Sequence, residues 1–414
     1  MDFKEYTVEE LVNNNMLEKP IDGNHGNKHP KSSDYVKKGI PFIMVSDIDN
    51  GKINYNTCKF ITEYQKNNLD KGFSKPGDIL LSHKATIGVT CIVDNSYTEI
   101  VITPQLTYYR VKNGINKYYL KYYFDSPYFQ NILKNWATSG STRAYLGITA
   151  QLKLPILLPE LEIQDKIAKI LSVIDRKIEI NNQTNDNLLE ISQTIYDNYI
   201  KENSDLKYSK IMDLNPRLET GKRPSGGVND INSGVPSIGA ESIKGLGFFD
   251  YSKTKYISEE YFTKMKKGIV KGYEVLIYKD GGRPGYFTPN FSMFGEGFPY
   301  NKCALNEHVF LLDFNDIKFN VFAYYYFNSI ETRNKLHVLG SKSAAIPGIN
   351  QQDILNLEIP SVENKSINEI IDILMLNTKK ILKNSYQNYT LAKLRDTLLP
   401  KLMNGEIDLD KIEI

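Results

Sequence analysis

Two long stretches of the chain carry apolar residues at every third or fourth position, one over about residues 160–203 and one over about residues 363–402. This spacing predicts two amphipathic helices, each with an apolar seam like that of a coiled coil. The first stretch contains neither glycine nor proline, and we expect Pro400 and Gly405 to end the second. At ~1.5 Å of rise per residue, a helix of about 40 residues spans roughly 60 Å.

The two predicted helices differ in charge and in one polar segment. Residues 160–203 hold nine acidic and five basic residues, whereas residues 363–402 hold four acidic and seven basic residues. Opposite net charge favours pairing of the helices with each other, and the long sequence between them makes an antiparallel arrangement the simple geometry. The alternative is that both charged faces are only solvated. An amide-rich segment, residues 181–187, interrupts the first seam and indicates either a polar layer or a break.

The rest of the chain shows a mixed pattern that occurs twice, about 195 residues apart. Residues 77–93 combine β-branched runs with glycine and aspartate, which predicts strands, and residues 117–134 have helical apolar spacing. A period this long indicates a duplicated domain, because solenoid units run about 20–50 residues. The clearest matches between the copies are Gly39-Ile40-Pro41 with Gly234-Val235-Pro236, Ile61-Thr62-Glu63 with Ile257-Ser258-Glu259, Gly77-Asp78 with Gly272-Tyr273-Glu274, and Gly140-Ser141 with Gly340-Ser341.

The duplication predicts an α+β fold with four segments. Residues 1–155 and 207–357 are expected to form two mixed α/β domains. Residues 156–206 and 358–414 are expected to form the two long helices, which separate the domains and pair as an antiparallel coiled coil.

Composition limits the function classes. The 51 basic and 49 acidic residues give a net charge of only +2, so any attraction for nucleic acid must come from local clusters. The three cysteines are far apart and lack metal-ligand spacing, which indicates reduced thiols in a cytoplasmic protein. The polar N-terminus does not resemble a signal peptide, and no apolar run approaches the ~18 residues that span a membrane, so no membrane partner is expected.

Motifs for catalysis are missing from the sequence. It has no phosphate-binding loop, no dinucleotide fingerprint, no zinc-protease motif and no tetrapeptide typical of amino-methyltransferases. His25 and His29 are four residues apart, but their Gly- and Lys-rich loop offers no partner ligand, so we expect no metal site there. The sequence therefore favours binding over catalysis, with no catalytic residue in this chain.

Basic and small polar residues gather in the predicted loops of both copies. Such side chains suit phosphate oxygens and base edges, and the occurrence of the same types at matching places raises them above ordinary surface residues. The candidate DNA-binding residues of the first copy are Lys28, Lys31, His83, Lys84, Thr86, Ser141, Thr142 and Arg143. Those of the second copy are Lys222, Arg223, Lys279, Arg283, Ser341, Lys342 and Ser343.

This layout resembles the specificity subunit of bacterial type I restriction–modification systems over essentially the whole chain. The most telling stretches are residues 158–171, which begin Leu158-Pro159-Glu160, and residues 391–407, which include Arg395-Asp396 and Asn404-Gly405. The resemblance implies two target-recognition domains that each read one half of a split, asymmetric site in double-stranded DNA. It implies that the helix pair sets the gap between the halves.

The same resemblance implies partners and no cofactor of its own. Two modification subunits would dock on the helices and methylate adenine, and two restriction subunits could join for cleavage. S-adenosylmethionine, ATP and Mg²⁺ would be bound by those partners. Two alternatives remain open at this stage. One is the recognition portion of a single-chain restriction–methylation enzyme, and the other is a coiled-coil scaffold without a DNA role.

Overall fold

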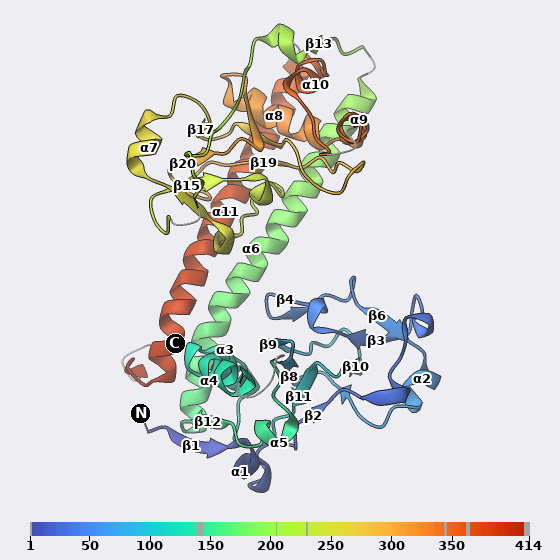
Figure 1. Cartoon of the computed structure of the whole chain (residues 1–414), viewed down its shortest axis with the longest axis vertical. Coiled ribbons are helices and arrows are strands. Elements are labelled where there is room, and N and C mark those ends of the chain that lie inside the picture. The colour runs from blue at the N-terminus through green and yellow to red at the C-terminus, as the bar shows by residue number, and fades with distance from the viewer. Residues whose placement is uncertain are drawn as a thin grey trace. The chain divides into compact units, whose positions relative to one another are not determined.

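The structure, a computed structural model of the chain, describes residues 2–138, 144–203, 205–228, 231–342, 346–361 and 365–409. Its contacts divide the chain into two compact units. Unit 1 comprises residues 1–176 and 392–414, and unit 2 comprises residues 177–391. Each unit therefore holds one copy of the repeat together with parts of both long helices (Figure 1). The predicted segments treated the helices as separate from the domains, whereas these units join each helix end to the domain on which it packs.

Unit 1 is built from short strands and short helices. Its strands are β1 (Lys4–Thr7), β2 (Ile21–Asp22), β3 (Ile40–Ile43), β4 (Ile48–Asp49), β5 (Lys52–Ile53), β6 (Lys59–Ile61), β7 (Phe73–Ser74), β8 (Ile79–Lys84), β9 (Thr86–Ile92), β10 (Ile100–Ile102), β11 (Leu106–Tyr109) and β12 (Pro155–Leu158). Its short helices are α1 (Val8–Asn13), α2 (Glu63–Asn67), α3 (Lys117–Asp125), α4 (Pro127–Thr138) and α5 (Ile148–Gln151). The long helix α6 (Leu161–Glu202) begins in this unit.

Unit 2 repeats this series of elements. Its strands are β13 (Tyr208–Lys210), β14 (Arg217–Thr220), β15 (Val235–Ile238), β16 (Lys255–Ile257), β17 (Ile269–Val270), β18 (Val275–Tyr278), β19 (Phe291–Met293), β20 (Cys303–Leu305), β21 (Val309–Asp313) and β22 (Glu358–Pro360). Its short helices are α7 (Glu259–Lys264), α8 (Ile317–Asn328), α9 (Ile330–Gly340) and α10 (Gln351–Leu355). The second long helix, α11 (Lys365–Met403), begins in this unit and ends in unit 1.

The two units share their strand order. One four-stranded sheet has the order β6-β3-β10-β7 in unit 1 and β16-β15-β20-β17 in unit 2. The other has the order β2-β11-β8-β9 in unit 1 and β14-β21-β18-β19 in unit 2. A two-stranded antiparallel ribbon, β1-β12 or β13-β22, completes each copy. The predicted duplication and the α+β fold are confirmed, and the pair β4-β5 is an addition in unit 1.

A backbone crossing explains two repeated glycines. A Cβ atom on Gly23 would lie 2.2 Å from the carbonyl oxygen of Ile102, and one on Gly221 would lie 1.6 Å from that of Leu305. A second glycine with positive φ passes beside each of them, Gly72 in unit 1 and Gly268 in unit 2. Because no side chain fits at such a contact, both copies need glycine there.

The Gly77-Asp78 match marks a buried carboxylate that accepts from an arginine at the end of another strand. Asp78 is 1% exposed and accepts from Arg110 Nε at 2.7 Å and Nη2 at 2.8 Å. In unit 2, Glu274 is 2% exposed and accepts from Arg217 Nη2 at 3.2 Å. A buried carboxylate persists only with such partners. Each copy therefore keeps a carboxylate before β8 or β18, with an arginine directly after β11 in unit 1 and at the start of β14 in unit 2.

The long helices contribute to the core of each unit. In unit 1, Ile167 and Leu171 of α6 share a core cluster with Leu399 and Leu402 of α11. Arg395 of α11 donates from Nη1 to Asp175 of α6 at 2.9 Å. Burial of these apolar side chains is worth about 1.5–3 kcal/mol each, so the end of α11 is an integral part of the domain.

In unit 2, α6 and α11 meet through an amide layer. Asn181 is 2% exposed and donates from Nδ2 to Gln387 at 2.9 Å and to Asn388 at 2.8 Å. Asn384 donates to Asn185 at 2.9 Å. Residue numbers fall along α11 as they rise along α6, so the helices run antiparallel, as predicted. The amide-rich segment is therefore a polar layer within a continuous helix, not a break.

Two helix boundaries differ from expectation. The helical stretch at 117–134 is two helices, because Ser126 adopts an extended conformation before Pro127 and caps the second helix. Helix α11 continues past Pro400 to Met403, and Gly405 (φ 71°) follows its end. Proline removes one hydrogen bond but tertiary packing of Leu402 holds the last turn.

In the part of the chain that is described, none of the helices combines the length and the apolar character that a membrane crossing requires.

Candidate nucleic-acid interface

The β8–β9 hairpin presents polar side chains at its tip. Lys84 ends β8 and Thr86 begins β9, and both are exposed. Ala85 makes the connection alone, with a φ of 66°. The Lys84 Nζ atom lies 5.9 Å from the centre of the Tyr145 ring, which is 47% exposed. The tip thus combines a cation with an exposed aromatic ring, a pairing that suits phosphate contact and base stacking.

His83 does not belong to this surface, which corrects its prediction as a loop residue. The side chain is 1% exposed within β8, and its Nδ1 atom lies 2.8 Å from Thr107 Oγ1. Burial lowers the pKa of His83 to about 4, so the ring is neutral at physiological pH. Position along the strand explains the error, because Ile79–His83 of β8 are all buried and only Lys84, at the end of the strand, is exposed.

Lys28 and Lys31 lie in the loop that follows β2. The Lys28 Nζ atom lies 2.6 Å from Asp70 Oδ1, and both side chains are mostly exposed. Lys31 is exposed, and its backbone amide donates to Asp34 at 2.7 Å. A surface ion pair contributes only about 0–1 kcal/mol, so Lys28 can exchange Asp70 for a phosphate at little cost.

In both units the hairpin lies beside the segment that follows the repeated Gly-Ser element. Ala85 donates its amide proton to Ala144 O at 3.0 Å in unit 1, and Gly281 donates to Pro347 O at 2.9 Å in unit 2. The candidates Ser141, Thr142, Arg143 and Ser343 lie outside the described residues. The structure therefore brings the neighbours of these candidates together with the hairpin in both copies.

The candidates Lys279 and Arg223 of unit 2 take part in an ion-pair network. Lys279 Nζ lies 3.3 Å from Asp280 Oδ2, and Arg223 Nε lies 3.4 Å from Glu307 Oε1. His308 lies between these carboxylates, at 2.5 Å from Asp280 and 3.3 Å from Glu307. Their positive charge is partly neutralised within the protein, so these two residues attract phosphate less than an unpaired cation does.

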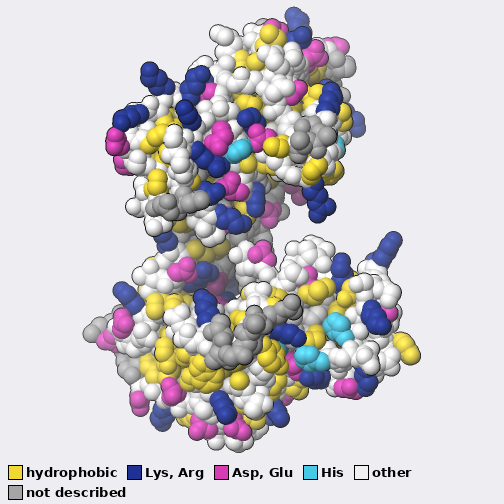
Figure 2. Space-filling view, in the orientation of Figure 1, with side chains coloured by type: hydrophobic (Ala, Val, Ile, Leu, Met, Phe, Trp, Pro, Cys, Tyr) yellow, Lys and Arg dark blue, Asp and Glu magenta, His cyan; other side chains and the backbone are white. Residues whose placement is uncertain are grey.

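The remaining candidates of unit 2 differ in role. Lys222 and Lys342 are exposed. Ser341 accepts at Oγ from the backbone amide of Phe287 at 2.9 Å, so this hydroxyl positions the end of the β18–β19 connection. Figure 2 shows Lys and Arg side chains spread over the visible face of each unit and interleaved with Asp and Glu, as the small net charge requires.

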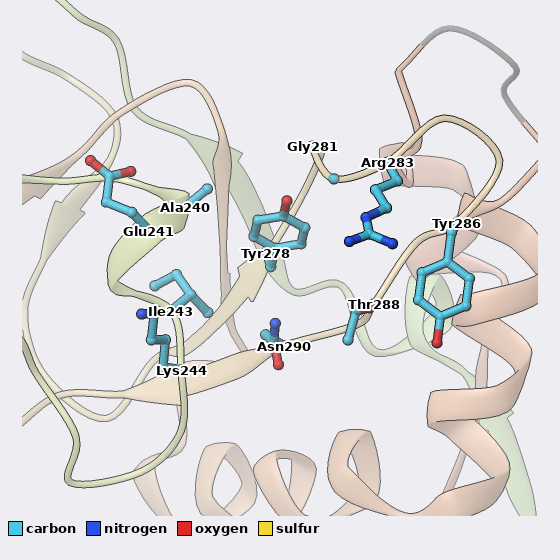
Figure 3. Close-up of a pocket in the computed structure, with 11 residues that line it drawn as sticks. Ala240, Glu241, Ile243, Lys244, Tyr278, Gly281, Arg283, Tyr286, Thr288 and Asn290 are labelled. Atoms are coloured by element: carbon cyan, nitrogen blue, oxygen red, sulfur yellow. The ribbon is translucent and has the colours of Figure 1, made fainter. Parts of the chain in front are cut away.

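A cleft opens beside the connection between β18 and β19. Its volume is about 460 Å³, and its lining includes Tyr278, Arg283, Tyr286 and Asn290. Figure 3 shows the Arg283 side chain between Tyr278 and Tyr286, directed toward the space bordered by Thr288 and Asn290. Burial, aided by Asp280, raises the pKa of Tyr278, so its phenol stays protonated and can donate a hydrogen bond.

Sequence reasoning missed two exposed tyrosines at this surface. Tyr145 lies against Lys84, and Tyr286 is 59% exposed beside Arg283 on the cleft. Their position in the sequence was an available signal. Tyr145 directly follows the run Gly-Ser-Thr-Arg-Ala of the first copy, and Tyr286 directly follows the run Gly-Gly-Arg-Pro-Gly of the second. The high tyrosine content of the chain, with 28 in total, hides such a signal.

Within the described ranges, no three His, Cys, Asp or Glu side chains gather in a way that could hold a metal ion. Cys58, Cys91 and Cys303 are free and buried. Burial raises the pKa of Cys58 to about 11 and that of Cys303 to about 12, which leaves these thiols unreactive.

Comparison with known proteins agrees with the duplication. The family model of the type I restriction modification DNA specificity domain matches residues 3–190 and again residues 203–388. The type I restriction enzyme MjaIX specificity subunit of Methanocaldococcus jannaschii is 24% identical over 410 residues, which cover 92% of this chain and 90% of that protein. The MjaVIII specificity subunit of the same organism is 27% identical over 181 residues, 41% of this chain and 40% of that protein.

A solved structure has the same fold. The crystal structure of a type I restriction–modification S subunit from M. genitalium superposes with a TM-score of 0.54 at 14% identity, covering 97% of this chain and 96% of that chain. Since the family model accounts for both copies of the repeat and for most of the chain, the protein belongs to the family of type I restriction modification DNA specificity domains.

Proposed function

We propose that the chain is the specificity subunit of a type I restriction–modification complex, with each repeat copy reading one half of a bipartite, asymmetric DNA site. The observation that carries this proposal is the match of the family model to both copies, which share one strand order. Exposed cations beside exposed tyrosines support it, Lys84 with Tyr145 in unit 1 and Arg283 with Tyr286 in unit 2.

In this proposal the chain binds DNA and partners but performs no catalysis. Two modification subunits dock on the long helices and methylate adenine with S-adenosylmethionine, and two restriction subunits are an optional addition that uses ATP and Mg²⁺. The assembly works in the cytoplasm. Support comes from the missing catalytic motifs and from the buried cysteines.

The test is an exchange of one domain followed by sequencing of methylated DNA. The intact chain is expressed with its modification subunit in a host without other adenine methylation, and the methylated motif is read. Replacement of residues 207–357 by the corresponding domain of a relative should change one half of the motif and leave the other half unchanged. A motif that changes in both halves, or in neither, would contradict one domain per half-site.

Two further measurements separate the alternatives. Methyl transfer or S-adenosylmethionine binding by the purified chain alone would favour a single-chain enzyme. Failure to bind DNA at any salt concentration would favour a scaffold, because phosphate contacts make DNA affinity fall with salt.

A further inference from the structure

We infer that the cleft around Arg283 reads a G·C base pair in the half-site bound by unit 2, with Arg283 as the residue that specifies guanine. This inference rests on the proposed function and adds to it a residue, a base and a half-site. It is drawn from three features of unit 2: a guanidinium without a partner among the described residues, a tight turn that presents it, and a cleft whose lining combines neutral hydrogen-bonding side chains with the Glu241 carboxylate.

The guanidinium of Arg283 has no partner within the described part of the chain. By contrast, Arg110, Arg217 and Arg395 each form an ion pair of 3.2 Å or less. Arg333 donates to Pro289 O at 2.8 Å. Arginines in this protein are thus usually engaged by its own acceptors. An exposed one that points into a cleft keeps its five donors for a ligand (Figure 3).

A tight turn fixes the position of Arg283. Residues 283–286 read Arg-Pro-Gly-Tyr, and the Tyr286 amide donates to Arg283 O at 3.0 Å. Pro284 occupies the second position and Gly285, with a φ of 73°, the third, which is the pattern of a type II turn. Proline and the closing hydrogen bond restrict the backbone, so little backbone entropy is lost when Arg283 binds.

The base of the connection is also fixed. Gly281 has a φ of 128°, and a Cβ atom there would lie 2.5 Å from the Tyr278 hydroxyl oxygen. The absence of a side chain therefore lets the connection pass close to Tyr278. The Gly281 amide donates to Pro347 O at 2.9 Å, which ties the connection to the neighbouring segment.

The lining of the cleft includes groups that suit a base edge. Tyr278, Thr288 and Asn290 offer neutral donors and acceptors, Lys244 adds a second cation, and Glu241 adds a carboxylate that repels a phosphate. Lys255 lies 3.4 Å from the Glu241 carboxylate and neutralises it only in part. Arginine pairs with the O6 and N7 acceptors of guanine, and a carboxylate accepts from the N4 amino group of cytosine. Arg283 and Glu241 thus match the two bases of a G·C pair.

The β8–β9 connection of unit 1, which the structure describes in full, has no counterpart of this turn, and this difference confines the prediction to one half-site. The connection between β8 and β9 is Ala85 alone, whereas residues 279–290 connect β18 and β19. A change at Arg283 should therefore leave the half-site of unit 1 untouched.

The experiment compares four versions of the full chain, each in complex with its modification subunit. These are the wild type, Arg283→Ala, Arg283→Lys and Lys335→Ala. Lysine keeps the charge but loses the two-pronged geometry. Lys335 is a surface cation of α9 in the same unit, paired with Glu331 at 2.8 Å, and serves as the control. For each complex, the methylated motif is sequenced, and affinity is measured for duplexes that carry every single base-pair change in that motif.

The expected result is a loss of discrimination at one G·C position of the second half-site. Arg283→Ala and Arg283→Lys should both lower the preference for that pair by roughly 10- to 100-fold. The first half-site should stay unchanged, and Lys335→Ala should keep the wild-type motif. A uniform loss of affinity with an unaltered motif, and a salt slope reduced by about one, would assign Arg283 to a phosphate and overturn the inference.

The outcomes also separate this inference from the proposed function. A wild-type complex that yields no bipartite motif would refute the function itself. A wild-type complex with a bipartite motif, combined with an Arg283→Ala variant of the same motif and affinity, would refute only the assignment of Arg283.

Discussion

An insertion of matched length in both long helices should change the gap between the two half-sites. The structure indicates where to insert, because the compact units meet along the chain between Arg176 and Lys177 in α6 and between Leu391 and Ala392 in α11. Four helix-forming residues at each of these places leave the contacts within each unit intact, including the Asn181–Asn388 and Asp175–Arg395 hydrogen bonds.

The size of the effect follows from helix geometry. Four residues add about 6 Å of helix, and four residues exceed one turn by about 40°. DNA rises ~3.4 Å per base pair, so the gap should grow by about two base pairs. Two base pairs rotate the DNA by about 70°, at 10–10.5 base pairs per turn. The remaining mismatch of about 30° predicts partial loss of activity.

The assay is sequencing of methylated DNA from cells that express each variant with the modification subunit. The paired insertion should methylate both original half-sequences with a gap about two base pairs longer. The same insertion in α6 alone serves as the contrast, because it leaves the two helices unequal in length by about 6 Å and forces one to loop out. That variant should lose activity without a defined new gap. An active paired-insertion variant that keeps the original gap would refute the role of the helices as a spacer.

Three further predictions concern single features. Replacement of Lys28, Lys31 and Lys84 by alanine should weaken binding to all DNA sequences. The slope of the logarithm of affinity against the logarithm of salt concentration should fall by about one for each phosphate that the protein no longer neutralises. An unchanged slope in salt titrations would show that these lysines face only solvent. Arg110→Met leaves the carboxylate of Asp78, which is 1% exposed, without its main partner, and should lower the free energy of unfolding of unit 1 by about 3–5 kcal/mol in urea. The control Lys112→Ala, at an exposed hydrogen bond, should lower it by under about 0.5 kcal/mol. Equal effects of the two substitutions would contradict the role of Asp78 as a buried partner of Arg110. The pKa of His83 is lowered to about 4 from an ordinary 6.5, so the unfolded chain binds the extra proton first, and stability should rise by up to about 3 kcal/mol between pH 4 and 6.5. His83→Gln should flatten that rise, and a rise of the same size in the variant would locate it elsewhere.

The sequence by itself determined the duplication, the two long helices and their antiparallel pairing. These features rest on local periodicity and on repeated residues, which remain visible without knowledge of distant contacts. The structure adds that Gly23 and Gly221, at corresponding places in the two copies, lie at a backbone crossing that excludes a Cβ atom. The pairing of the Gly77-Asp78 and Gly272-Tyr273-Glu274 elements reflects a buried carboxylate in each copy.

Only the tertiary structure decided which side chains face outward and which are engaged by the protein itself. His83 and Lys84 are neighbours in sequence, yet His83 lies in the buried part of β8 and Lys84 lies at its exposed end. Lys279 and Arg223 resemble free cations in the sequence, but acidic residues of the folded unit pair with them. Arg283, by contrast, meets no acceptor among the residues that the structure describes. The amide-rich segment of α6 was open to two interpretations, and its partners on α11, about 200 residues away, made it a polar layer. Side-chain exposure and ion pairing depend on contacts that form only in the folded chain, and the local sequence pattern does not indicate these contacts.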